Sequence, residues 1–133
     1  MNAYSFKVTD ENGNDIDVTL RLDLGGQKKL SDKYKDSTME TIFRAPHNIE
    51  VMCDVLTNAL NFKNNKNIIK KGSDLYDLMV ENGMGGIRKW QLFMNEIAAA
   101  SGIVDDEEKE ALNDRANTAV DKLLKEDDDE PKN

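Results

Sequence analysis

The sequence predicts a mainly α fold, a small helical bundle with an N-terminal two-stranded β-hairpin, at the margin of the α+β class. Two observations support this. Polar and apolar residues alternate in two short N-terminal stretches, as they do in half-buried strands. In most of the remaining chain, apolar residues recur at steps of three and four, as they do in amphipathic helices. A chain of 133 residues is long enough for one domain whose core needs neither disulfides nor metal.

The predicted strands are residues 4–9 and 15–22, where apolar residues occupy alternate positions. Between them, Asn12 and Gly13 supply the backbone with positive φ that a tight hairpin turn requires. Such a hairpin has one apolar face. Because an isolated hairpin is marginal in water, this face is expected to pack on the helices.

Three helical segments are predicted next. Asp23 can cap a helix over residues 24–35, and Ser37 begins a capping-box pattern before a short helical turn. Pro46 disfavours helical backbone at the preceding residue and so ends that turn. The central helix then covers residues 48–62.

The central helix is apolar over most of its circumference, and this predicts that it has neighbours on several sides. Its apolar positions are Ile49, Val51, Met52, Cys53, Val55, Leu56, Ala59, Leu60 and Phe62. Cys53 is interpreted as a small core residue. Further helices are predicted from the cap Ser73 to Asn82, and from Ile87 to the stop at Gly102.

The chain divides by charge into a hairpin-plus-helix core domain (1–104), an acidic amphipathic helix (105–125) and a disordered acidic tail (126–133). Residues 105–133 hold 12 acidic and 5 basic residues, which is most of the net charge of −8. The helix either packs as the last member of the bundle or acts as an arm that docks on another chain. The predicted partner-binding residues form its apolar seam: Leu112, Ala116, Ala119, Val120, Leu123 and Leu124.

No catalytic, cofactor or metal site is predicted. The only histidine, His47, lies too far along the chain from Cys53 for the two to meet on one helix, and no Cys or His pattern fits zinc. The basic cluster Lys63, Lys66, Lys70 and Lys71 lacks interleaved aromatic residues. The acidic C-terminal segment repels phosphate backbones, so nucleic acid is not the expected partner. No membrane span or secretory signal is expected, and the single cysteine favours the cytoplasm.

Three stretches together resemble the tail assembly chaperones of long-tailed bacteriophages and prophages of Gram-positive bacteria. These are VTLRLDLGGQKKL (residues 18–30), METIFRAPHNIEVMCDVLTNALN (39–61) and DLYDLMVENGMGGIRKWQLFMNEIAAASGIV (74–104). The first is a strand leading into a helix with a Gln-Lys-Lys-Leu patch. The second is a short helical turn, a proline break and a helix. The third is a helix, a glycine break and a helix with a Ser-Gly-Ile ending. The acidic helix and tail lie outside this resemblance.

The resemblance implies a small helical protein without enzymatic activity or cofactor. It further implies binding to the tape-measure protein, which the chaperone keeps soluble, and recruitment of tail tube subunits in the host cytoplasm. Self-association, a frameshifted longer form and absence from the mature virion are also implied. Two alternatives stay open: a structural tail or connector component of the phage, and a small cytosolic regulator that acts by binding proteins.

Overall fold

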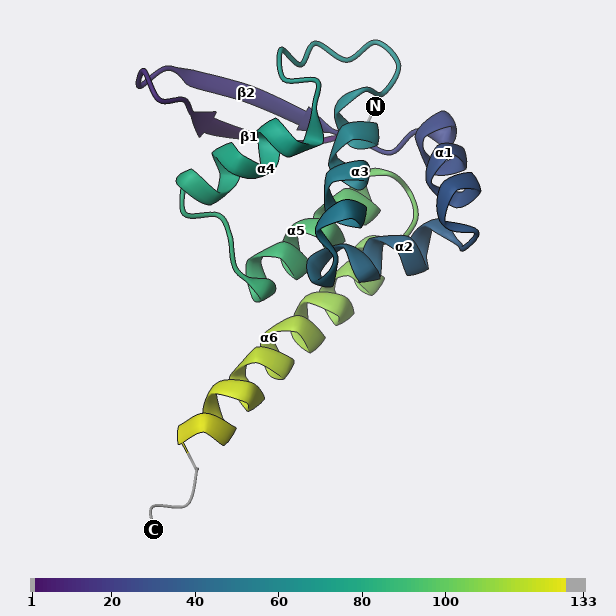
Figure 1. The fold of residues 1–133 in the computed structure, drawn as a ribbon. Coiled ribbons are helices and arrows are strands. Elements are labelled where there is room, and N and C mark those ends of the chain that lie inside the picture. The colour runs from purple at the N-terminus through teal and green to yellow at the C-terminus, as the bar shows by residue number, and fades with distance from the viewer. Residues whose placement is uncertain (1, 129–133) are drawn as a thin grey trace.

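The computed structural model of this chain describes residues 2–128, and it confirms the predicted fold class (Figure 1). A two-stranded hairpin lies against a small bundle of helices. In chain order the elements are β1 (Tyr4–Thr9), β2 (Asp15–Leu20), α1 (Leu24–Tyr34), α2 (Thr38–Arg44), the 3-10 helix η1 (Ala45–His47), α3 (Ile49–Leu60), α4 (Gly72–Glu81), α5 (Ile87–Ala100) and α6 (Asp106–Asp128).

The hairpin is antiparallel, as predicted, and its register runs from Tyr4 opposite Leu20 to Thr9 opposite Asp15. Gly13, with φ +79°, provides the left-handed backbone of the turn. Strand β2 ends at Leu20, two residues earlier than predicted. The reason is that the next two amides bond to helices instead of to β1: Arg21 N donates to Ala59 O (3.1 Å) and Leu22 N donates to Ser101 Oγ (2.8 Å).

Aromatic side chains attach the hairpin to α5. The rings of Tyr4 and Phe6 meet Phe93 edge to face, with ring centroids 5.5 and 5.3 Å apart. Edge-to-face packing of this kind adds about 0.5–1.5 kcal/mol per pair beyond the buried area. The helices therefore supply the support that an isolated hairpin lacks.

Helix α3 is the centre of the bundle, as predicted, and contacts β2, α1, α2, η1 and α4. Its buried residues are Val51, Met52, Val55, Leu56, Ala59 and Leu60. Two predicted core positions are wrong. Ile49, in the first turn at the end of the bundle, is 59% exposed, and Cys53 is only half-buried. The buried face is thus narrower than the run of apolar residues.

Two of the three predicted caps are confirmed. Asp23 Oδ1 accepts the amide of Gly26 (2.9 Å), and Ser37 Oγ accepts the amide of Glu40 (3.1 Å). The cap assigned to Ser73 is wrong, because α4 already begins at Gly72. A side chain of the neighbouring helix takes over the capping role: the Gly72 amide donates to Thr57 Oγ1 of α3 (2.8 Å).

Asp23 also joins α1 to the loop between α3 and α4, since its Oδ2 accepts the amide of Lys63 (2.9 Å). The hydrogen bonds from Gly26 and Lys63 lower the pKa of this carboxyl group. The stabilisation that the ionised carboxylate provides is present above the unfolded-state pKa, and it is lost as the pH falls through the lowered folded-state pKa.

Replacing Asp23 with alanine is expected to lower the free energy of unfolding at pH 7 by about 1–2 kcal/mol, through loss of the cap. Urea denaturation followed by circular dichroism at pH 7 and pH 2.5 measures this. The difference from the wild type should shrink at the lower pH, as protonation removes the charge of the carboxylate. Asp23→Asn, which keeps an acceptor but no charge, is the control. A difference that does not change with pH would contradict the role of the charge.

Candidate protein-binding site

Helix α6 begins with a capping box. Asp105 Oδ1 accepts the amide of Glu108 (2.7 Å), and Glu108 Oε1 accepts the amide of Asp105 (3.1 Å). Acidic residues in the first turn also suit the positive end of the helix dipole. The helix runs from Asp106 to Asp128, three residues beyond the predicted end. The remainder of the predicted disordered tail, residues 129–133, lies outside the described residues.

The first half of α6 packs against α5. Asn95 Nδ2 donates to Asn113 Oδ1 (3.0 Å), and Lys109 Nζ lies 3.4 Å from Glu96 Oε2. Leu112 packs on the core, and Ala116 is only 7% exposed. The first two residues of the predicted binding seam thus lie in or beside the bundle.

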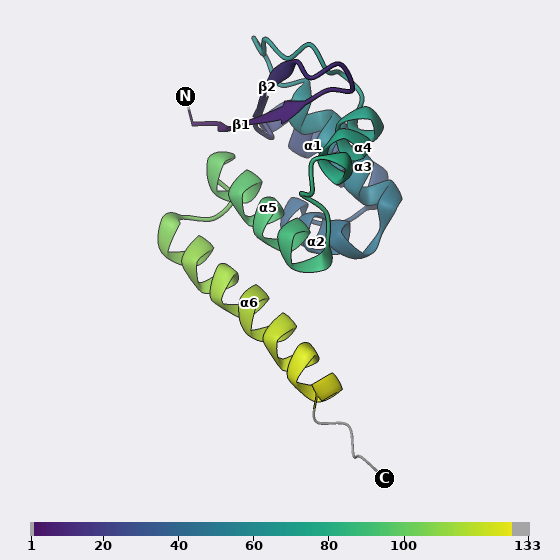
Figure 2. The same cartoon turned by 90° about the vertical axis from the view of Figure 1, so that its left-hand side faces the viewer.

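The second half of α6 extends away from the bundle, as both views show (Figures 1 and 2). Ala119 lies at the point of departure, exposed but still lining a groove. Beyond it, Leu123 and Leu124 are 59% and 58% exposed. Nothing is described for the side chain of Val120. The predicted seam is therefore divided between a packed part and an exposed part.

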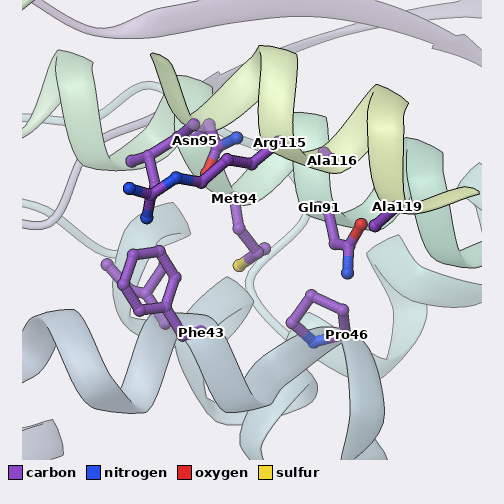
Figure 3. Close-up of a pocket in the computed structure, with 10 residues that line it drawn as sticks. Phe43, Pro46, Gln91, Met94, Asn95, Arg115, Ala116 and Ala119 are labelled. Carbon is purple, nitrogen blue, oxygen red and sulfur yellow. The ribbon is translucent and has the colours of Figure 1, made fainter. Parts of the chain in front are cut away.

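A groove of about 290 Å³ lies between α6 and the segment formed by α2 and η1, with α5 as its floor (Figure 3). Arg115 and Phe43 are seen at one end, and Gln91, Pro46 and Ala119 at the other. Its lining residues are Ile42, Phe43, Pro46, Gln91, Met94, Asn95, Leu112, Arg115, Ala116 and Ala119. The lining is mostly apolar with a few polar groups, which is typical of a site that receives apolar side chains.

Gln91 contributes an unsatisfied polar atom to this groove. Its Oε1 is buried and has no hydrogen-bond partner among the described residues. A buried acceptor without a hydrogen bond lowers the stability of the folded protein, and such acceptors are rare in native structures.

The sequence prediction found three of the groove residues, Leu112, Ala116 and Ala119, and missed the others. The missed residues come from α2, η1 and α5, whose sequences show only ordinary helix periodicity. Arg115 alone gave a local signal, as a charge beside the apolar seam.

The thiol of Cys53 does not have the lowered pKa of an activated nucleophile. Burial, chiefly, raises the pKa of its thiol, with Asp54 and Asp77 adding to the shift. A raised pKa keeps the thiol protonated and poorly reactive. His47 lies in η1. Among residues 2–128, no cluster of three or more His, Cys, Asp or Glu side chains could hold a metal ion. In the same range, no helix combines the length and apolar character needed to cross a membrane.

The two halves of α6 are expected to differ in their effect on stability. Deleting residues 120–133 should leave the melting temperature within about 2 °C of the wild type, because residues 121–124, the deleted residues whose exposure is described, are all exposed. Deleting 105–133 should cost about 2 kcal/mol, since it uncovers the face of α5 on which Leu112 and Ala116 pack. Thermal unfolding followed by circular dichroism measures both. Equal losses would contradict the division of the helix.

The chain matches no protein-family model, no curated protein and no solved structure.

Proposed function

We propose that this chain is a phage tail assembly chaperone, a non-enzymatic protein that binds the tape-measure protein and keeps it soluble. It acts in the host cytoplasm, helps to recruit tail tube subunits, and leaves before the virion matures. The proposal rests on the resemblance of residues 18–30, 39–61 and 74–104 to that family.

The observation that carries a binding role is the exposed half of α6. Leu123 and Leu124 are more than half exposed on a helix that has left the bundle. Exposed apolar side chains on a helix suit recognition of another protein chain, most simply by helix-to-helix packing. The groove directly beside this helix enlarges the apolar surface available to a partner.

Co-expression with the tape-measure protein of the same genome tests the proposal. The wild-type chain is expected to co-purify with it and to increase its soluble fraction. The double variant Leu123→Asp, Leu124→Asp should lose much of this effect while keeping its melting temperature. A double variant at exposed positions that lie away from both leucines around the same helix, Ala111→Asp and Thr118→Asp, serves as the control because it adds the same charge.

Failure of the wild-type chain to bind or solubilise the tape-measure protein would contradict the proposal. Finding the chain in purified virions at fixed stoichiometry would instead favour a structural tail or connector component. A gene position outside the tail module would favour a small regulatory protein.

A further inference from the structure

We infer that the groove between α6 and the α2–η1 segment binds an amphipathic helix of a partner protein that carries acidic residues beside its apolar face. This inference deepens the proposed function, on which it rests for the identity of the partner.

The shape of the site favours a helix as the occupant. Leu112, Ala116, Ala119 and Leu123 follow one another at steps of three and four, so they share one face of α6. This face lines the groove as far as Ala119 and continues past the bundle at Leu123. A helix laid along α6 would contact the groove and the exposed half of α6 in one continuous interface.

The small residues of α6 leave room for side chains of the partner. Ala116 and Ala119 face Phe43 and Pro46 across the groove, and all four line it (Figure 3). Phe43 is 39% exposed, which is high for a large apolar side chain. A volume of about 290 Å³ is sufficient for one or two leucine-sized side chains, which a helix presents at successive turns.

The charges at the rim favour an acidic partner. Arg115 lines the groove, Lys122 follows it two turns later on the same flank of α6, and Arg88 precedes Gln91 by one turn on α5. All three are exposed, and none forms an ion pair within the described residues. The N-terminus of α5 adds positive charge, since no acid lies in its first turn and no side chain caps it.

The acids nearby do not offset these cations. Successive residues of an α-helix are about 100° apart around its axis. Asp114 and Asp121 therefore lie on the side of α6 roughly opposite its groove-facing residues. On α2, Glu40 precedes Phe43 by one turn, and Arg44, directly after Phe43, is already paired with Asp36 (3.6 Å). Glu40 is thus a single acid against the three cations. The rim is therefore net positive although the whole chain has a net charge of −8.

A designed peptide tests the site directly. The probe is a 21-residue peptide with leucines at steps of three and four and glutamates on both flanks. Two control peptides replace the glutamates with lysines or the leucines with serines. Titration of the ¹⁵N-labelled full chain should shift amide signals at Phe43, Gln91 and 112–119, and neither control peptide should do so.

Matched variants separate the groove from the rest of α6. Ala119→Glu should weaken binding of the probe at least tenfold, because it places an acid in the groove. Asn117→Glu, which places the same acid at an exposed position outside the groove and out of pairing distance of Arg115 and Lys122, should change the affinity less than twofold. Arg115→Glu with Lys122→Glu should weaken binding at least tenfold, whereas Lys28→Glu with Lys29→Glu on α1 should not.

Four results would overturn the inference: no binding of the acidic probe, shifts that lie mainly outside the groove, equal binding of the lysine peptide, or concentration-dependent dimerisation that Ala119→Glu abolishes. The last would make a second copy of this chain the occupant of the groove.

Failure of the proposed function can be told apart from failure of the groove inference. If the probe binds but the tape-measure protein does not, the proposed function fails. If the tape-measure protein binds Ala119→Glu as well as the wild type, the groove inference fails.

Discussion

Replacing Gly72 with alanine is expected to lower the free energy of unfolding by about 3 kcal/mol or more, the largest effect of any single methyl group in this chain. An added Cβ would lie 2.1 Å from Cys53 O, 2.6 Å from Thr57 Oγ1 and 2.7 Å from Thr57 N. Two of these atoms belong to the backbone of α3 and cannot rotate away. Helices α3 and α4 would have to separate, and the bond from the Gly72 amide to Thr57 would be lost.

Urea denaturation followed by circular dichroism measures this loss. Gly25→Ala is the matched control, because Gly25 is helical and its added Cβ would meet only Asp23 Oδ1, at 3.6 Å. That variant should be unchanged or more stable, by up to about 1 kcal/mol, as alanine favours helix over glycine. A Gly72→Ala variant as stable as the wild type would mean that α3 and α4 do not approach so closely.

Replacing Asn67 with leucine is expected to cost about 2–4 kcal/mol. The Asn67 side chain is 5% exposed and makes three hydrogen bonds to backbone. Its Oδ1 accepts the amide of Thr19 (2.9 Å), and its Nδ2 donates to Thr19 O (2.7 Å) and Leu60 O (2.8 Å). Leucine has a similar volume but cannot replace any of these bonds, so buried backbone groups of β2 and α3 would lose their partners.

Asn82 provides an unusually close control. Its side chain bonds both the amide and the carbonyl of Thr9 on β1, at 2.9 and 3.0 Å, in the same way that Asn67 bonds Thr19. These bonds are exposed to solvent, so water can replace them when the side chain is removed. Asn82→Leu should therefore cost less than about 1 kcal/mol. Similar losses for the two variants would show that burial does not decide the strength of these contacts.

Local sequence predicted the elements of this fold well, because their signals lie within a few residues. The turn at Gly13, the caps at Asp23 and Ser37, and the stop at Gly102 are each specified by the residue that occupies the position. The alternating strands and the periodicity of α5 likewise identify their own faces, whereas the periodicity of α3 made its buried face too wide, by Ile49 and Cys53. These features need no knowledge of what lies across the core.

Contacts between distant segments could not be predicted in this way. Ser73 looks like a helix cap, but Thr57, on another helix, takes that role and moves the start of α4 to Gly72. Asn67 occurs in a polar, lysine-rich stretch typical of an exposed loop, yet it is buried because it satisfies the backbone of β2. In both cases the deciding partner is at least 15 residues away.

The candidate site shows the same limit. Periodicity identified the apolar seam of α6, but it contains no information about where the bundle ends, and therefore none about which seam residues are covered. Ala116 and Leu123 are equivalent in the sequence pattern, whereas one is buried and the other is largely exposed. The opposite wall of the groove, with Phe43 and Pro46, comes from a segment some 70 residues earlier.

The division of α6 also bears on how its exposed half stays helical. A peptide of about ten residues rarely forms a helix alone, because starting a helix fixes several residues before the first hydrogen bond is gained. In α6 the turns packed on α5 provide that start, and the exposed turns only extend it. The bundle thus acts as a nucleus for a helix whose outer part could not form independently. A partner would meet a surface that is already ordered, and little of its binding energy would be spent on folding that surface.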